Sequence, residues 1–140
     1  MTTIWKLDPN GPLDCLIVDD DPSVIDTLKM YCEDLHLFRN IIVAEDGHMA
    51  TTKMSNQKFA LILIDLNMPK KDGIKLLKDF SSKTNINNID NVVIVSGELD
   101  QKKLTEAISM KVKNFITKPF SEEVFQDKVR PALNLVKEND

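Results

Sequence analysis

The sequence predicts an α/β fold, a single doubly wound domain in which a parallel sheet of five strands is covered by five helices. Short apolar runs, each followed by turn residues, recur along the chain and are typical of strands buried on both faces. Segments with apolar residues at helical spacing alternate with these runs, which predicts a parallel sheet with right-handed crossovers. The length of 140 residues is that of one domain. The expected strands are Cys15–Val18, Ile41–Ala44, Leu61–Ile64, Val92–Val95 and Phe115–Ile116.

The N-terminal residues are expected to form an arm rather than a regular element. They include four residues that favour turns, Pro9, Asn10, Gly11 and Pro12. We therefore divide the chain into an arm, residues 1–13, and a domain that spans residues 14–137. Whether Trp5 packs against that domain is left open.

The first three helices are predicted from apolar periodicity and capping residues. Proline is a favoured first helical residue and aspartate a favoured cap, so Asp21 is expected to cap a helix over about Pro22–Leu35. The second helix, about His48–Met54, has a thin apolar face and should be short. The third is expected to start near Gly73 and to include Phe80.

The last two helices are predicted in the same way. Asp100 is expected to cap a helix over about Gln101–Met110, and Ser121 is expected to cap the final helix. Pro131 lies inside that final helix, where its missing N–H group should kink or split it. The apolar residues expected to face inward are Phe125, Val129, Ala132, Leu133 and Val136.

Composition argues against several classes of function. The chain has 22 acidic and 18 basic residues and a net charge of −4, which disfavours direct binding to nucleic acid. No apolar stretch is long enough to span a membrane, and the first residues lack the apolar centre of a secretory signal. Cys15 and Cys32 fall within apolar patterns without metal-site spacing. We interpret them as small core residues, without a disulfide, in a reducing cytoplasm.

Side chains suited to chemistry follow four of the five expected strands. Asp19 and Asp20 follow the first strand, Asp65 the third, Ser96 the fourth and Lys118 the fifth. The carboxyl ends of parallel strands meet at one edge of a sheet. The flavodoxin-like strand order 2-1-3-4-5 makes the first and third strands neighbours at the point where ligands bind. We therefore expect the three carboxylates to converge there.

Such a carboxylate cluster needs a cation, because like charges held close repel one another. Hard oxygen ligands of this kind suit Mg²⁺. A strand-end aspartate, a divalent cation, a lysine and a hydroxyl are what phosphoryl transfer to a carboxylate requires. Taken singly, each residue has a plainer interpretation: a loop cap for Asp65, a turn residue for Ser96 and a solvated surface residue for Lys118.

Other polar residues are given structural interpretations. Glu45 and Asp46 follow the edge strand and are expected to play no part in the cluster, and His36 and His48 are taken as surface residues. Four lysines around the fourth helix are interpreted as a solvated face, in preference to a surface for an acidic partner. These are Lys102, Lys103, Lys111 and Lys113.

Four motifs, each at its own strand end, carry a resemblance to a known family. They are VDDDP (Val18–Pro22), LIDLNMPKKDG (Leu63–Gly73), VSGE (Val95–Glu98) and FITKPF (Phe115–Phe120). In their order and spacing the chain resembles a response-regulator receiver domain, the phosphoacceptor module of two-component signalling. The resemblance covers about Leu13–Val136.

The resemblance implies a role for each member of the cluster. Asp65 would accept the phosphoryl group and also bind Mg²⁺. Asp20 would be a direct metal ligand, Asp19 a ligand that acts through water, and the backbone carbonyl of Asn67 would complete the metal shell. Lys118 would bind phosphoryl oxygens.

Further positions of the family pattern concern switching. Ser96 would be the hydroxyl that moves to the phosphoryl group, and Phe115 the switch aromatic. The Lys118–Pro119 peptide is a candidate for the cis form. Asn67 and Glu98 stand where the lifetime of the phosphoryl group is tuned.

Two departures from the family pattern stand out. Lys111 occupies a position that is usually glycine with a left-handed backbone, so we expect either strain or a different turn. Lys113 and Asn114 replace the acidic pair of the winged-helix transcription-factor subgroup, and the dimer of that subgroup is therefore not expected.

The expected function is that of a signalling receiver and not an enzyme, although it would catalyse its own phosphotransfer and dephosphorylation. The phosphoryl donor would be a histidine kinase or a phosphotransfer protein. The surface of the fourth helix, fifth strand and fifth helix would then control a protein partner or a fused effector domain. No contact with nucleic acid or membrane is expected, and whether the chain acts alone or as part of a larger protein is left open.

Alternative functions share the topology. A haloacid-dehalogenase-like phosphatase also uses a strand-end aspartate and Mg²⁺, but it needs a second aspartate where Asn67 stands. A flavodoxin-like cofactor binder needs a phosphate-cradling loop after the first strand, and none is present. A phosphorylation-independent binding module is the remaining alternative.

Overall fold

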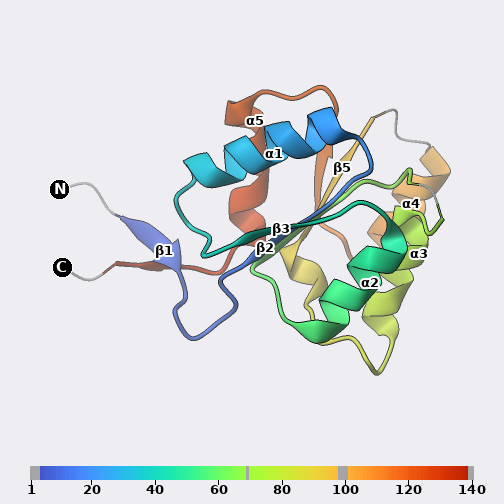
Figure 1. Cartoon of the computed structure of the whole chain (residues 1–140), viewed down its shortest axis with the longest axis horizontal. Coiled ribbons are helices and arrows are strands. Elements are labelled where there is room, and N and C mark those ends of the chain that lie inside the picture. Colours follow the sequence, from blue (N-terminus) through green and yellow to red (C-terminus); the bar gives the residue numbers. More distant parts are fainter. Residues whose placement is uncertain (1–3, 69, 98–100, 139–140) are drawn as a thin grey trace.

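A parallel sheet of five strands forms the centre of the computed structural model, which describes residues 4–68, 70–97 and 101–138. The strands lie in the spatial order β3-β2-β4-β5-β6 (Figure 1). Numbered within this sheet, that order is 2-1-3-4-5, so the predicted fold class and strand order are confirmed. The strands are β2 (Cys15–Val18), β3 (Ile41–Ala44), β4 (Leu61–Ile64), β5 (Val92–Ser96) and β6 (Asn114–Thr117).

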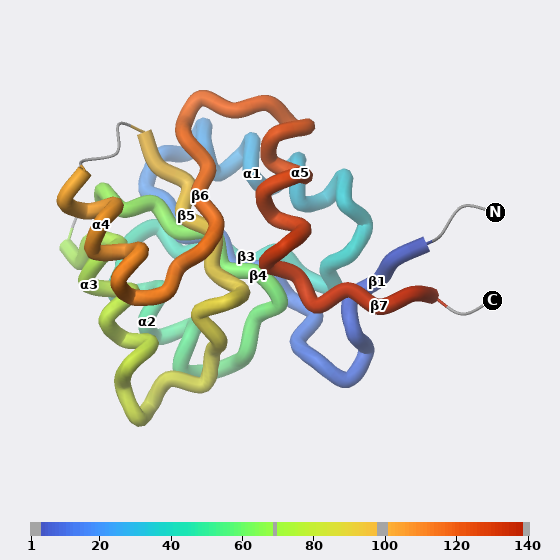
Figure 2. The backbone as a smooth tube through the Cα atoms, turned by 180° about the vertical axis from the view of Figure 1, so that it is seen from behind, coloured from blue at the N-terminus to red at the C-terminus, as the bar shows by residue number. Residues whose placement is uncertain are grey.

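Five α-helices of the described residues cover both faces of this sheet (Figures 1 and 2). Helices α1 and α5 pack on one face, and α2, α3 and α4 pack on the other. In the described part of the chain, no helix has the length and apolar character needed to cross a membrane. The helices are α1 (Pro22–Asp34), α2 (Gly47–Asn56), α3 (Gly73–Lys78), α4 (Gln101–Ser109) and α5 (Glu122–Val129).

Alternate residues of each strand build two separate cores, because successive side chains point to opposite faces of a sheet. In β2, Cys15 and Ile17 pack towards α1 and α5, whereas Leu16 and Val18 pack towards the other three helices. All four are at most 1% exposed. Burial on both faces is the reason why the central strands β2 and β4 are apolar throughout.

Side-chain caps begin the helices largely as predicted. Asp21 and Ser121 cap α1 and α5 by accepting hydrogen bonds from N–H groups of the first turn. Helix α2 extends beyond the predicted His48–Met54, since Asp46 caps it through a 2.9 Å hydrogen bond from a backbone N–H. The predicted cap Asp100 lies outside the described residues.

The N-terminal arm contains a regular strand, which corrects the expectation of an arm without one. Residues Trp5–Leu7 form β1, which pairs antiparallel with β7, Leu135–Lys137. This small sheet of two strands lies beside the central domain (Figure 2). Leu7 enters the core under α1 and α5. Local composition could not indicate β1, because its partner lies at the other end of the chain.

Helix α5 ends at Val129, earlier than the apolar periodicity predicts. Pro131 lies in a short 3-10 turn, so its effect is to end the α-helix, in line with the expected break. Ala132 and Leu133 stay buried, as predicted. Val136 instead belongs to β7, and its predicted place on the inward face of the helix is wrong.

Lys111 has a left-handed backbone, with φ of 74°, where the chain turns from α4 towards β6. Its N–H donates to the carbonyl of Ile108 at 2.9 Å, which ends the helix. A residue with a Cβ atom is strained in this conformation, whereas glycine is not. The expected left-handed turn is therefore present, and its backbone is strained at Lys111.

Lys111→Gly is expected to raise the free energy of unfolding by about 0.5–1 kcal/mol, because relief of strain outweighs the extra chain entropy of glycine. Urea denaturation of both proteins measures this change. Lys113→Gly is the control: position 113 has no positive φ, so glycine should destabilise the fold there. Equal destabilisation by the two substitutions would contradict the argument.

Cys15 and Cys32 are free, buried thiols in the core, as predicted. Their Sγ atoms lie 3.8 Å apart, a distance of contact and not of a bond. Burial raises the pKa of the Cys15 thiol well above its usual value, and the neighbouring Cys32 raises it further. Both thiols therefore act as small packing groups.

Candidate functional site

Three carboxylates, a hydroxyl and an ammonium group meet at the carboxyl edge of the central sheet. Lys118 Nζ lies 2.9 Å from Asp19 Oδ2 and 3.2 Å from Asp65 Oδ2. The Ser96 hydroxyl donates to Asp65 Oδ1 at 3.2 Å. Asp20 completes the group: one oxygen from each of the three carboxylates lies within 4.8 Å of the others. The structure thus brings together the five residues that follow the strands.

Backbone hydrogen bonds at the strand ends orient the two buried carboxylates. Asp19 accepts from the N–H of Asp21, and Asp65 Oδ1 from the N–H of Asn67, both at 3.0 Å. Asp65 N donates to the carbonyl of Val18 at 2.9 Å, which ties the ends of β2 and β4 together. Asp19 is 1% exposed and Asp65 6%. Their orientations are therefore set by the fold and not by solvent.

Gly73 allows the first turn of α3 to lie against the strand end that carries Asp65. A Cβ atom at position 73 would be 2.5 Å from the carbonyl oxygen of Asp65 and 2.7 Å from Cα of Leu66. Gly73 N also donates to the carbonyl of Leu66 at 3.0 Å. Any other residue would push α3 away from the loop that follows Asp65.

The turn after β6 places Lys118 between the two acids. Its backbone N–H donates to the carbonyl of Ser96 at 2.8 Å, and the Lys118–Pro119 peptide is cis, as predicted. The side chain is only 20% exposed. Its ammonium group is thus held between carboxylates, where an isolated surface lysine would extend into water.

The cluster carries more negative charge than its lysine neutralises. Burial raises the pKa of Asp19, and the Asp65 carboxylate adds to the rise, although hydrogen bonds from Asp21 N–H and Lys118 oppose it. Burial alone would lower the pKa of Lys118, but the hydrogen bonds and charges of Asp19 and Asp65 outweigh it, and the pKa is raised. One firmly protonated lysine therefore faces three carboxylates, an arrangement that favours a divalent cation.

The donor set fits a hard divalent cation such as Mg²⁺. All three candidate side-chain ligands offer carboxylate oxygens, the ligands this ion prefers. Asp20 is exposed whereas Asp19 and Asp65 are buried, so the site opens to solvent on one side. Asn67, whose carbonyl is expected to bind the metal, follows Asp65 on an exposed part of the loop.

Position 67 also contacts α4, which sequence reasoning missed. Lys103 Nζ donates to Asn67 Oδ1 at 2.6 Å. Phe115, the expected switch aromatic, lies beside Ile94 in the sheet and is half-buried against the core under α2, α3 and α4. Glu98 lies outside the described residues. The hydrogen bond between Lys103 of α4 and Asn67 in the loop after β4 joins segments far apart in sequence, so no local motif could indicate it.

Helix α2 and the turn after α3 brace the loop between β4 and α3 from another side. Lys71 Nζ lies 2.7 Å from Asp79 Oδ2 and 2.8 Å from Thr51 Oγ1. Lys70 Nζ lies 3.5 Å from Asp46 Oδ2. Asp46 thus supports the loop and the start of α2, and it is not a member of the carboxylate cluster found among the described residues.

Comparison with known proteins identifies the family. Residues 15–130 match the response regulator receiver domain family. The chain belongs to this family. The receiver domain is also 30% identical over 121 residues to the chemotaxis protein CheY of Pseudomonas aeruginosa, an alignment that covers 86% of this chain and 96% of CheY. The predicted resemblance is thereby confirmed.

Other similar proteins include a longer relative and solved structures. The regulatory protein VirG of Agrobacterium tumefaciens is 29% identical over 130 residues, which cover 89% of this chain and 46% of VirG. The receiver domain thus spans about half the length of VirG. The structure of chemotaxis protein CheY4 from Vibrio cholerae has the same fold, with a TM-score of 0.73 at 22% identity, covering 88% of this chain and 100% of that one.

Proposed function

We propose that this receiver domain accepts a phosphoryl group on Asp65 from a phosphohistidine of a histidine kinase or phosphotransfer protein. The observation that supports this most is the position of Lys118, whose ammonium group contacts both Asp19 and Asp65. A lysine held in this place can bind an oxygen of a phosphoryl group that arrives at Asp65. A loop cap beside a surface lysine would not need this arrangement.

The chemistry assigns one task to each residue. A carboxylate oxygen of Asp65 attacks phosphorus, and the new P–O bond forms as the P–N bond to the imidazole breaks, with its electron pair leaving on nitrogen. Lys118 binds an equatorial oxygen of the phosphoryl group, and the Ser96 hydroxyl donates to another. Mg²⁺ would be held by Asp65, by Asp20, by Asp19 through water and by the Asn67 carbonyl, and when bound it would supply the remaining positive charge.

Phosphorylation adds negative charge at Asp65 and thereby provides a switch. Ser96, already 3.2 Å from Asp65 Oδ1, would turn to a phosphoryl oxygen, and Phe115 would fill the space that it leaves. The surface of α4, β6 and α5 would then shift towards a form that binds a protein partner or a fused effector domain. The bond from Lys103 to Asn67 gives α4 a direct connection to the site.

The proposal describes a signalling protein that catalyses its own phosphotransfer and dephosphorylation. A cytoplasmic location is part of it, since reduced, buried Cys15 and Cys32 suit a reducing compartment. The proposed function includes no direct contact with nucleic acid or membrane. The phosphorylated domain would pass on its signal by binding a protein partner or a fused effector domain.

The mass of the intact protein after incubation with acetyl phosphate and Mg²⁺ tests the proposal. We expect one added phosphoryl group, absent in Asp65→Asn and absent when EDTA removes the metal. No addition to a folded protein that binds Mg²⁺ would contradict the proposal and leave a phosphorylation-independent binding module. Sustained release of phosphate from a simple phosphate ester would indicate a phosphatase instead.

A further inference from the structure

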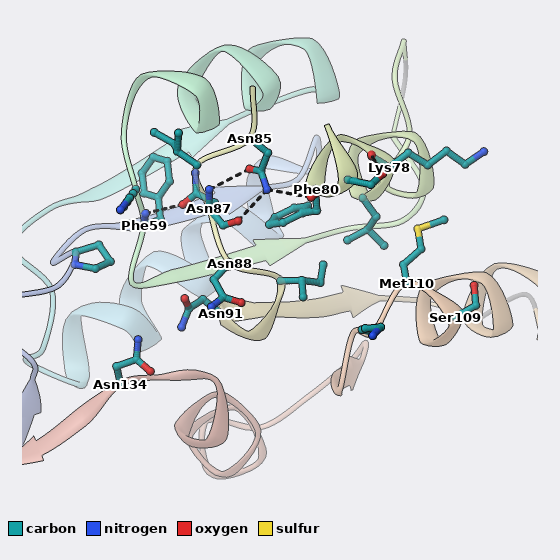
Figure 3. A pocket seen from close by; sticks show the side chains of 17 residues that line it. Phe59, Lys78, Phe80, Asn85, Asn87, Asn88, Asn91, Ser109, Met110 and Asn134 are labelled. Atoms are coloured by element: carbon teal, nitrogen blue, oxygen red, sulfur yellow. Dashed lines mark hydrogen bonds between the residues drawn. The ribbon is translucent and has the colours of Figure 1, made fainter. Parts of the chain in front are cut away.

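Figure 3 shows a large open groove, which does not include Asp65 in its lining. Its volume is about 970 Å³. Phe59 and Asn91, which line it, directly precede β4 and β5, so the groove faces the amino ends of these strands. The segment between α3 and β5 forms one wall, and Met110 and Lys111, which follow α4, belong to another. The groove is therefore separate from the phosphoacceptor site.

Internal hydrogen bonds hold the asparagine-rich wall of the groove in place. Asn87 Oδ1 accepts from the N–H of Phe59 at 2.7 Å, and Asn87 Nδ2 donates to the carbonyl of Met54 at 2.8 Å. Asn85 Nδ2 donates to the carbonyl of Phe80 at 3.3 Å (Figure 3). These bonds fix a segment without regular structure against α2 and the 3-10 turn that follows α3. A partner would therefore meet a wall that is already formed, which lowers the entropic cost of binding.

The groove is positively charged although the chain as a whole is acidic. Three exposed lysines line it, Lys58, Lys78 and Lys111, and no aspartate or glutamate does. Among the described residues, no ion pair uses any of the three. Two acids adjoin lining residues in the sequence, Asp79 and Asp90, and neither lines the groove. Asp79 Oδ2 lies 2.7 Å from Lys71 Nζ, and Asp90 Oδ1 lies 3.4 Å from Lys113 Nζ. The charge of the groove thus complements an acidic ligand.

Lys111 has a left-handed backbone, in which a residue with a Cβ atom is strained. Glycine would satisfy the same turn without strain. Lys111 lines the groove, so Lys111→Gly removes a groove charge while the turn is kept.

The groove also offers apolar surface between the charges. Ile86 is 44% exposed, and Phe80 and Met110 are half-buried along the lining. We propose that this groove is a docking surface for a segment of a partner protein in which acidic residues flank apolar side chains. The acids meet the lysines, and the apolar side chains cover Ile86 and its neighbours. This interaction lies beyond the proposed phosphotransfer and does not depend on it.

Synthetic peptides with Asp and Glu around Leu, Ile or Phe test the proposal, each paired with a peptide in which Asn and Gln replace the acids. They are titrated into the ¹⁵N-labelled, unphosphorylated full chain. We expect acidic peptides to shift the amide signals of residues 85–89 and 109–111. Their neutral counterparts should bind at least about tenfold more weakly, and added salt should weaken the acidic ones. Because no phosphoryl donor is present, the result is independent of the phosphorylation of Asp65.

Paired substitutions then locate the binding surface. Lys78→Glu with Lys111→Glu should weaken binding at least about tenfold, since two attractive charges become repulsive. The matched control, Lys75→Glu with Lys128→Glu, changes the net charge equally at exposed lysines off the groove and should change affinity by less than about twofold. Lys111→Gly should also weaken binding while the fold stays intact, which separates the side chain from the turn.

Three results would overturn the proposal: no acidic peptide binds, the neutral peptides bind equally well, or the control pair weakens binding as much as the groove pair. Inorganic phosphate that alone shifts the same amide signals and displaces the peptides would make the groove a small-anion site. That result would also count against a protein partner.

Discussion

Lys118→Met is expected to slow the phosphorylation of Asp65 by acetyl phosphate at least about a hundredfold, the usual effect of removing one group that stabilises transition-state charge. Methionine preserves much of the length of the side chain and removes only the ammonium group. The phosphoryl oxygens then lose the one protein cation that contacts both Asp19 and Asp65 among the described residues. The rate at which the mass of one phosphoryl group is added measures the effect.

The same variant should bind Mg²⁺ at least as tightly as the wild type. The ammonium group of Lys118 occupies Asp19 Oδ2 and Asp65 Oδ2, and its removal frees both oxygens for the metal. The control is Lys70→Met, which removes another lysine from the same edge of the sheet, paired with Asp46. It should be phosphorylated within about twofold of the wild-type rate. Wild-type rates for Lys118→Met with Mg²⁺ bound would refute the assigned role.

Asp14→Asn is expected to lower the free energy of unfolding by about 2 kcal/mol. Asp14 is 3% exposed, and its carboxylate accepts hydrogen bonds from Arg39, Asn40 and Gln57 at 2.9–3.2 Å. These bonds join the start of β2 to the start of β3 and the end of α2. Asparagine has the same shape but turns an N–H₂ donor towards other donors. The effect stays near 2 kcal/mol because Arg39, whose side chain is 63% exposed, remains hydrated.

The difference in free energy of unfolding between the wild type and Asp14→Asn should depend on pH, and the sign of this dependence follows from the pKa of Asp14. Burial alone would raise the pKa of Asp14, but the hydrogen bonds from Arg39, Gln57 and Asn40 and the charge of Arg39 outweigh it, so the pKa is lowered in the folded state. A lowered pKa stabilises the fold above the unfolded value and loses this effect as pH falls through the folded value. Urea denaturation curves of wild type and Asp14→Asn should therefore differ at pH 7 and converge below about pH 4. A difference that stays constant as pH falls well below that value would contradict the argument.

The strands of the central sheet and the positions of their chemical residues were predictable from the sequence. A strand of a covered parallel sheet must be apolar on both faces, so the apolar run that contains Leu61–Ile64, bounded by Lys58 and Asp65, is recognisable without knowledge of the fold. Because parallel strands share one carboxyl edge, residues as distant as Asp19 and Lys118 could be expected to meet, and they do at 2.9 Å. Each prediction here needs only local sequence and one topological rule.

Contacts between segments far apart in the chain were not predictable in this way. The hydrogen bond from Lys103 to Asn67 and the four-residue network around Asp14 use side chains that look like ordinary surface residues in the sequence. The groove beside Lys111 likewise forms from segments whose sequence separation hides their proximity. Such polar contacts have no periodicity, so nothing in a local window distinguishes them from solvated residues.

The segments near the two ends of the chain separate what local sequence predicts from what tertiary structure determines. Pro131 alone predicts that α5 cannot continue, because it has no N–H group to donate and its ring clashes with the preceding turn. The structure of the residues after Pro131 depends on a segment from the other end of the chain. Leu135–Lys137 becomes a strand only because Trp5–Leu7 lies beside it. The backbone N–H and C=O groups of a strand form their hydrogen bonds with a neighbouring strand, which the local sequence does not contain.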